Sequence, residues 1–508
     1  MINILLDLVN EKDFNSRIVK KIREELPDAR ISMILGTPEE LPIFEQLGEC
    51  ILRDNTARGI YEEQQLDMEH CVPIDDELLQ YMNQYSLEIL YQQRRFEGYP
   101  NFSIDPALES HYTVYMHNLF FWYNYLKRKQ ITHVFISTVP HEGYDCMIYY
   151  LCKYLDIPVQ MINVSIIQNR RYPFKDICCP DIAFVREYEK LQEQYRDVPV
   201  EDIPLEESTR VLYEGWSSLE PDRMKPWYMK VNPFSRRLRT RCGEFNIIRV
   251  WRGLLGPDYV QYGLGIRFWG AAVRKIPQMI KKIPNTYRRW RIAEPVRKSS
   301  ISLNNYYNSL AVEPVKGERY IYFPLHFQPE ATSNPMGGGL YADQMLPLNI
   351  LSKALPDDIK IYVKTHPEQL SLMRTREYYK DMVKIPRVRL IKQEASTYEL
   401  MKNALAVATL TGTAMWECQF YGIPALVFGY SLKNLAPLSY PVRTVEECRQ
   451  AVKLIMENPS RDALKELKIY TKAMHNQSFA FADLEKVLPM LIVNFVQGKE
   501  NVLEGIDR

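Results

Sequence analysis

The sequence predicts an α/β protein with two domains, each built around a parallel sheet. Its 508 residues are too many for one hydrophobic core, so two domains are the expectation. Short apolar segments alternate with segments of helical spacing near the N-terminus and again after residue 319. This alternation is typical of βαβ units. A hydrophobic fraction of 46% and a charged fraction of 25% are ordinary for a globular protein.

Composition narrows the functional classes. The net charge of +1 gives the whole molecule no strong attraction to nucleic acid. Nine cysteines, an odd number without a CxxC pair, indicate a reduced, intracellular chain. The first ten residues carry Asp7 inside an apolar run and lack a basic start, which predicts a strand and not a signal peptide. The sequence has no run of 18 apolar residues, so we expect no membrane span. We expect a cytoplasmic protein, with contact at the inner face of the cell membrane left open.

The N-terminal domain, expected over residues 1–215, begins with a strand, a helix and a second strand at 2–9, 13–25 and 30–35. Residues 40–130 have a mainly helical pattern, and the stretch 112–129, apolar and aromatic all round, predicts a buried helix. A second βαβ unit follows, with strands at 133–137 and 157–164 around a helix at 144–155.

The loop after the strand at 133–137 carries the first candidate catalytic residues, His141 and Glu142, with Asp145 just beyond it. Parallel sheets bind ligands at the carboxyl ends of their strands. A base in this position would deprotonate an acceptor hydroxyl. Solvated loop side chains are the alternative interpretation.

A basic segment separates the two domains. Residues 225–298 contain 18 Lys or Arg against 3 acidic residues, with four Trp interleaved. Within it, residues 266–291 alternate apolar and basic patches and are expected to be broken at Pro277 and Pro284. Such a segment is typical of a membrane surface contact, and it would also suit a polyanionic glycan or a solvated helical insertion. We expect a basic helical insertion and linker over 216–318, with the linker itself at 299–318.

The second domain, expected over 319–470, opens with an aromatic strand at 320–323 that runs into a long polar loop. The loop carries His326, Gln328 and Glu330, followed by three glycines at 337–339. A strand that ends in a polar, glycine-bearing loop is where open α/β sheets bind ligands. We expect His326 and Glu330 near the reacting sugar and Gln328 among the donor-binding residues.

Two further motifs follow strands of the same predicted sheet. Lys364, His366 and Pro367 end the strand at 359–364, where Lys supplies a positive charge and Pro sets the direction of the His. Thr411, Gly412 and Thr413 lie between a strand at 404–410 and a helix. Hydroxyls, a close backbone approach and free N–H groups at a helix start make an anion site.

Glu417 lies one turn into that helix and could accept both hydroxyls of a ribose. Other elements expected in this part are a helix at 342–354, strands at 387–391 and 425–428, a helix at 396–403 capped by Ser396, a helical region at 444–495 capped by Thr444, and a helical tail over 471–508.

The three loops could converge on one cleft that holds a nucleotide sugar, with the phosphates at Lys364 and 411–413, the ribose at Glu417 and the sugar near 326–330. No DxD-type pair, Walker loop or GxSxG motif is present, so we expect no metal and no cofactor beyond the donor.

The same motifs carry a resemblance to the bacterial capsule polysaccharide biosynthesis family, whose better-known members are Kdo transferases that use CMP-Kdo. They read FPLHFQPEATSNP, VKTHPEQ and ELMKNALAVATLTGTAMWECQFYGIPALVFG. The resemblance is strong over 319–429 and weaker over 133–171. It implies the GT-B architecture, two Rossmann-like domains facing each other across a cleft. It also implies donor nucleotide binding at His366 and Pro367 and donor phosphate binding at 411–413. The acidic catalytic residue of the family matches no single position, so retaining and inverting stereochemistry both stay open.

Three functions fit these patterns. The first is a glycosyltransferase that uses a CMP- or UDP-linked sugar, possibly CMP-Kdo, and a glycan or glycolipid acceptor. The second is a nucleotide-sugar 2-epimerase or a CDP-polyol phosphotransferase of the same fold. The third is a non-catalytic glycan assembly protein. The long N-terminal domain and the basic segment favour a large acceptor and therefore the first.

Overall fold

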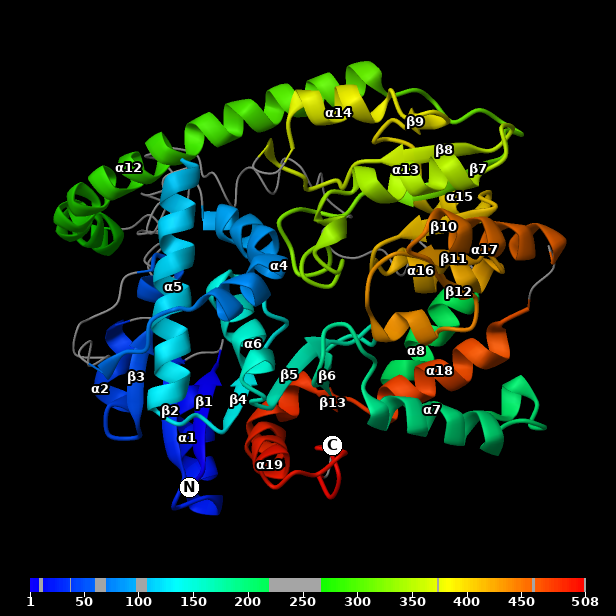
Figure 1. Cartoon of the computed structure of the whole chain (residues 1–508). Coiled ribbons are helices and arrows are strands. Elements are labelled where there is room, and N and C mark those ends of the chain that lie inside the picture. The colour runs from blue at the N-terminus through cyan, green and yellow to red at the C-terminus, as the bar shows by residue number, and fades with distance from the viewer. Residues whose placement is uncertain are drawn as a thin grey trace.

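The computed structural model describes residues 1–8, 12–36, 38–59, 70–96, 107–218, 266–371, 374–458 and 462–506. The chain forms two α/β domains, each with its own sheet (Figure 1). Both sheets have the doubly wound strand order of Rossmann-like domains. The prediction of two Rossmann-like domains, each with its own sheet, is confirmed.

The N-terminal sheet has seven strands in the order β13-β6-β5-β4-β1-β2-β3. Its strands are β1 (Asn3–Asp7), β2 (Arg30–Leu35), β3 (Glu49–Leu52), β4 (His133–Ile136), β5 (Val159–Val164), β6 (Arg170–Phe174) and β13 (Phe479–Ala480). β1 pairs in parallel with β2 on one side and β4 on the other. The strand order therefore reverses between β1 and β4: β2 and β3 are added on one side of β1, and β4, β5 and β6 on the other. All five residues of β1 are buried, as expected for a strand covered by helices on both faces.

The C-terminal sheet has six parallel strands in the order β12-β11-β10-β7-β8-β9. Its strands are β7 (Tyr320–Pro324), β8 (Lys360–Lys364), β9 (Val388–Leu390), β10 (Ala406–Thr409), β11 (Ala425–Val427) and β12 (Ser439–Pro441). Here the reversal lies between β7 and β10. Two predicted helix caps are confirmed: Ser396 accepts from the N–H of Glu399, and Thr444 forms a capping box with Glu447.

Helices cover both sheets. Those of the N-terminal half are α1 (Lys12–Glu25), α2 (Leu41–Phe44), α3 (Arg53–Ala57), α4 (Asp76–Gln93), α5 (Leu108–Arg128), α6 (Tyr144–Tyr154), α7 (Ile182–Gln194) and α8 (Glu207–Ser217). Those of the C-terminal half are α13 (Met345–Ala354), α14 (Arg376–Met382), α15 (Thr397–Lys402), α16 (Ala414–Glu417), α17 (Val445–Glu457), α18 (Leu464–Asn476) and α19 (Leu484–Val496). α5 is buried along most of its length, as predicted for residues 112–129.

The C-terminal segment is not the separate helical tail predicted for 471–508. β13 pairs antiparallel with β6, and α19 packs on α1 in the core of the N-terminal domain. α18 packs against α7 and α8, and so joins the two halves. The helical region predicted for 444–495 consists of α17, α18 and α19, with β13 between the last two helices. A two-residue strand depends on its partner and leaves almost no local signal in the sequence.

The basic segment is a single helix where the structure describes it. α12 (Ile266–Leu310) arches over the molecule in Figure 1, and its C-terminal part packs on α14. The predicted breaks at Pro277 and Pro284 are wrong, and the linker predicted for 299–318 is helical up to Leu310. Proline removes one hydrogen bond but keeps φ near the helical value, so neighbouring turns can carry a helix through it. Residues 225–265 of the segment lie outside the described residues.

Candidate functional site

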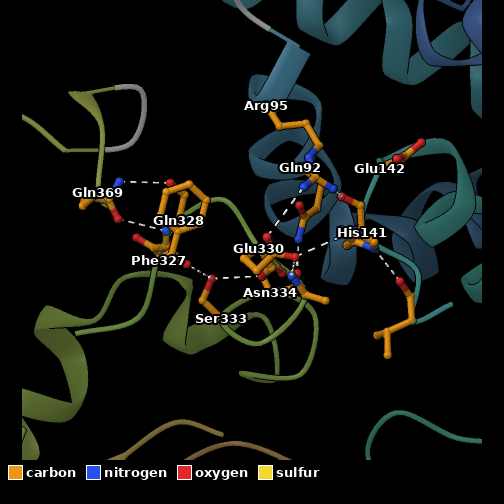
Figure 2. Close-up of polar contacts among 12 residues, drawn as sticks. Gln92, Arg95, His141, Glu142, Phe327, Gln328, Glu330, Ser333, Asn334 and Gln369 are labelled. Atoms are coloured by element: carbon orange, nitrogen blue, oxygen red, sulfur yellow. Dashed lines mark hydrogen bonds and ion pairs between the residues drawn. The ribbon is translucent and has the colours of Figure 1, made fainter. Parts of the chain in front are cut away.

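The candidate site lies at the carboxyl ends of the strands between which the strand order of each sheet reverses. In doubly wound sheets, ligands bind beyond the carboxyl ends of the strands at the point where the strand order reverses. The loop after β4 extends from this point in the N-terminal sheet, and the loops after β7 and β10 extend from it in the C-terminal sheet. A contact between His141 and Glu330 joins the first two loops directly (Figure 2).

Asp145 organises the loop after β4. Its carboxylate accepts hydrogen bonds from the backbone N–H groups of His141 and Glu142, both at 2.7 Å, and of Cys146 at 2.8 Å. The side chain is 1% exposed. Burial raises the pKa of Asp145, although neighbouring His141 opposes the rise. Asp145, predicted as a candidate base, is in this structure a residue that positions the two side chains before it.

His141 is held with one ring nitrogen available to the site. Its Nδ1 lies 2.5 Å from the carbonyl oxygen of Val139. A carbonyl only accepts, so Nδ1 carries the proton and Nε2 of the neutral ring has a lone pair. Nε2 lies 3.8 Å from Oε1 of Glu330, which belongs to the other domain. The geometry leaves His141 able to take a proton from a group between the two domains.

Glu142 lies in the same loop as His141, near a second acidic side chain, that of Asp7. Its carboxylate lies 3.6 Å from Nε of Arg53. Asp7, the last residue of β1, is buried nearby and accepts from the hydroxyl of Tyr144 at 3.2 Å. Burial, reinforced by the charge of Asp145, raises the pKa of Asp7 to about 8. The sequence contained a signal for Asp7, since a carboxylate inside an apolar strand is uncommon.

The loop after β7 is fixed by paired glutamine contacts. Gln369 exchanges hydrogen bonds with the backbone of Gln328, and Gln344 does the same with the backbone of His326. The side chain of Gln328 donates to the carbonyl of Ala342 and accepts from Arg374. Both ends of the Gln328 side-chain amide, which was predicted to bind the donor, are therefore bonded to protein groups, which makes Gln328 a positioning residue.

Glu330 and Asn334 connect the loop after β7 to the N-terminal domain (Figure 2). Glu330 lies 3.9 Å from Arg95, at the end of α4, in addition to its contact with His141. Asn334 donates to the carbonyl of Glu88 at 2.9 Å and accepts from Gln92 through its own carbonyl. Arg95 also donates to the carbonyl of His141 at 2.7 Å. The loop thus brings together Glu330 and His141, two of the predicted catalytic residues.

His326 links the loops after β7 and β10, the two strands between which the order of the C-terminal sheet reverses. The backbone N–H of Thr411 donates to its Nε2 at 3.2 Å. Burial, reinforced by the neighbouring basic side chains of His366, Lys433 and Arg374, lowers the pKa of His326 to about 3. The ring is therefore neutral near pH 7 and carries its proton on Nδ1. Nδ1 can donate a hydrogen bond to a ligand, but it cannot accept a proton.

The turn after β10 forms as predicted, but the helix behind it is short. The Thr411 hydroxyl donates to the carbonyl of Thr332 at 2.6 Å, so it ties this turn to the loop after β7. A side chain at Gly412 would meet the His326 ring at 3.3 Å, which explains the glycine. Thr413 is exposed, and α16 behind it has four residues, so its dipole adds little to anion binding.

Glu417 stands at the end of α16. Burial raises its pKa, and the Thr413 hydroxyl and Lys433 offset part of the rise.

Lys364 and His366 have different roles in the structure. The ammonium of Lys364 donates to the carbonyl of Ala395 at 2.5 Å and to the hydroxyl of Thr397 at 3.2 Å, so it anchors α15. The Nδ1 of His366 accepts from the N–H of Glu368 at 3.2 Å, and its ring lies 5.7 Å from that of Phe327. Pro367 lies in the turn that these contacts close.

Arg95, Arg374 and Lys433 also lie at this site and were not predicted. None lies in a recognisable motif, and each approaches the site only through tertiary packing. Among the described residues, no group of three His, Cys, Asp or Glu side chains is arranged to hold a metal ion. No helix within the described ranges is long and apolar enough to cross a membrane.

Comparison with protein families matches residues 337–498 to the family described as capsule polysaccharide biosynthesis protein. The match starts at the glycine-rich end of the loop after β7 and runs through α19. It confirms the resemblance read from the sequence for this part of the chain. No curated protein matches the chain significantly.

Solved structures of similar overall extent have low sequence identity to this chain. The UDP-GlcNAc 2-epimerase of Methanocaldococcus jannaschii is 12% identical over 94% of this chain and 98% of its own, with a TM-score of 0.25. A glycosyltransferase from Rickettsia africae ESF-5 is 9% identical over 98% of this chain and 99% of its own, also with a TM-score of 0.25. At these values the fold assignment rests on the strand order of the two sheets themselves.

Proposed function

We propose that the protein is a glycosyltransferase that moves a sugar from a nucleotide-activated donor to a glycan or glycolipid acceptor in bacterial surface or capsular polysaccharide biosynthesis. The observation that carries this proposal is the approach of His141 to Glu330, 3.8 Å apart on opposite domains. The family match over residues 337–498 supports the biosynthetic context. The donor class, CMP- or UDP-linked, belongs to the proposal.

In the proposed reaction the acceptor oxygen forms a bond to the anomeric carbon of the donor sugar. The bond from that carbon to the phosphate oxygen breaks, and its electron pair leaves with the nucleotide. His141 takes the proton of the acceptor hydroxyl, since its Nε2 holds a lone pair at the domain junction. Glu330 stabilises the imidazolium that results. The nucleotide lies on the C-terminal domain, near His366 and the turn at 411–413.

The proposal includes contact with an anionic membrane, where a lipid-linked acceptor would lie. Its support is α12, which carries exposed Trp269 and Val273 next to exposed Arg274. Interfacial helices combine such apolar and basic side chains.

The test is incubation of the purified protein with a panel of nucleotide sugars, with and without a capsular oligosaccharide acceptor. We expect sugar transfer that requires both donor and acceptor. Interconversion of free nucleotide sugars without an acceptor would instead indicate an epimerase, and transfer of a polyol phosphate from its CDP derivative would indicate a phosphotransferase. Loss of polysaccharide output on deletion of the gene, with full output restored by a His141→Asn, Glu330→Gln protein, would favour a non-catalytic assembly role.

A further inference from the structure

His326 lies near three basic side chains that follow two strands of the same sheet. His366 and Arg374 follow β8, and Lys433 follows β11. Arg374 donates to the carbonyl of His326 at 3.4 Å, and the turn that leads to Lys433 lies against Thr411, because a side chain on Gly429 would meet Thr411 at 2.6 Å. The charges of Arg374 and Lys433, at the same edge of the sheet, create a positive potential that attracts an anion.

Two members of this group hold buried donors without acceptors in the described part of the chain. Nδ1 of His326 has no partner, and the side chain is 6% exposed. Arg374 is 2% exposed, and its Nε has no partner. Its other nitrogens donate to Gln328 and to the carbonyl of His326, both uncharged. A buried cation is stabilised by an anionic partner, and no described carboxylate lies within ion-pair distance of Arg374, which favours an anionic ligand.

Lys433 has a fixed backbone and an uncommitted ammonium group. Its N–H donates to the Ser431 hydroxyl at 3.2 Å, and its carbonyl accepts from the Ser439 hydroxyl at 3.1 Å. Within the described ranges its ammonium forms no hydrogen bond or ion pair, while Glu417 lies within electrostatic range. Lys364 differs, because its ammonium is bonded to Ala395 and Thr397. Of the two lysines, Lys433 is the one with a charge to offer a ligand.

We propose that Lys433 and the Nδ1–H of His326 bind the phosphate of the nucleotide donor, with Arg374 adding positive potential from the buried side. The inference rests on the proposed function and deepens it. It moves the phosphate contact predicted for Lys364 to a residue outside the recognised motifs. A lysine ammonium in this position would form a charge-assisted hydrogen bond with a phosphate oxygen.

The experiment measures binding of CMP, UDP, cytidine and uridine to the full-length protein by titration calorimetry. The variants are Lys433→Gln, Lys433→Met and Lys433→Arg. Lys402→Gln is the matched control, because Lys402 is an exposed lysine of the same domain. We expect both neutral Lys433 variants to weaken binding of the preferred nucleotide about tenfold or more, and to leave binding of its nucleoside unchanged, since the nucleoside lacks the phosphate. Lys433→Arg keeps the charge and should stay within about threefold of wild type.

Unchanged nucleotide affinity in either folded neutral variant would overturn the inference while leaving the proposed function intact. Equal weakening of nucleotide and nucleoside would also overturn it, because that result indicates a structural role for Lys433. If neither nucleotide binds the wild-type protein, both the inference and the proposed function fail.

Discussion

At the scale of single residues, the account depends on His141 more than on any other side chain. Its Nδ1 is bonded to Val139, its N–H to Asp145 and its carbonyl to Arg95. These three contacts fix the ring and its tautomer, which is how a general base is prepared for proton transfer. Asp145 and Arg95 act through His141 and are positioning residues.

Replacing His141 tests this role. We expect His141→Asn to lower the transfer rate by about 10²- to 10⁴-fold, the range typical for loss of a general base. Nucleotide affinity should be unchanged, because the proposed donor site lies on the other domain. Rates are measured under donor saturation with labelled nucleotide sugar. Glu142→Gln serves as the comparison within the same loop and should cost far less. A fully active His141→Asn enzyme would remove His141 from the mechanism.

Glu88 gives a test of stability against pH. Burial raises its pKa to about 7, and the hydrogen bond from Tyr150 at 2.6 Å opposes the rise. The ordinary value is 4.5. Between these pH values the folded chain keeps a proton that the unfolded chain releases. Stability conferred by this group is thus present below pH 4.5 and is lost as pH rises through 7.

Glu88→Gln removes this ionisation while keeping the size of the side chain. We expect the variant to be more stable than wild type at pH 8, by on the order of 1–3 kcal/mol, and to lose that advantage by pH 5. Thermal unfolding across this pH range measures the difference. Glu189→Gln, a change at an exposed position, is the control and should show no such trend. A difference between Glu88→Gln and wild type that does not change with pH would contradict the expectation.

Residue types were predictable from the sequence where they stand in motifs, but their partners were not. His141, Glu330 and Thr411 were expected at strand ends, and the structure places them there. Lys364 has the same motif support, yet its ammonium bonds to Ala395. A motif fixes the position of a residue along a strand. Whether a long side chain reaches the ligand or a neighbouring helix depends on packing that local sequence does not encode.

At the scale of elements, the loop after β7 is the main link between the domains at the site. Glu330 contacts His141 and Arg95, and Asn334 is bonded to α4 in both directions. The sequence predicted this loop as the wall of a ligand site because it is polar and carries glycines. It did not reveal the bonds to α4, because their partners lie more than 200 residues away.

Strands with weak local patterns were missed for physical reasons. β6 contains two arginines and a proline in five residues, which argues against a strand in isolation. It forms because it pairs antiparallel with β5 at one side and β13 at the other. β3 has four residues and was absorbed into a region of helical pattern. Long, strongly periodic segments such as α5 were predictable from sequence alone.

α12 carries the prediction about membranes. We expect the full-length protein to bind vesicles that contain anionic lipid and to bind neutral vesicles weakly. Replacing exposed Arg274 and Arg291 with Gln should weaken that binding by about tenfold or more, at roughly 1 kcal/mol per charge near the surface. Vesicle sedimentation at low and physiological salt measures the effect. Deletion of 266–291 should abolish it.

The control for this experiment replaces Lys353 and Lys402, two exposed lysines of the C-terminal domain, with Gln. It changes net charge equally and should leave vesicle binding near wild type. Equal loss in both double variants would show that overall charge, and not α12, drives the attraction. Absence of binding to anionic vesicles by the wild-type protein would refute the membrane proposal outright.

At the scale of the whole molecule, two doubly wound sheets bring the loops at their reversal points together. The family match covers the C-terminal side of this junction, residues 337–498, and the N-terminal domain supplies His141. Two domains with parallel sheets were predictable from chain length and from the alternation of strands and helices. The return of β13 and α19 to the N-terminal domain was not, because long-range pairing is determined by the complete fold.

The most direct test of the central claim is a thermal-shift panel of the full-length protein with CMP, CDP, UDP and GDP. A nucleotide that binds only the folded state at 100 times its Kd stabilises it by about 2.7 kcal/mol. We predict that one nucleotide raises Tm clearly above the others, with CMP or UDP as the expected ligand, and that the corresponding nucleotide sugar does the same. A folded protein whose Tm responds to none of the four nucleotides would contradict the claim that this site binds a nucleotide-activated sugar.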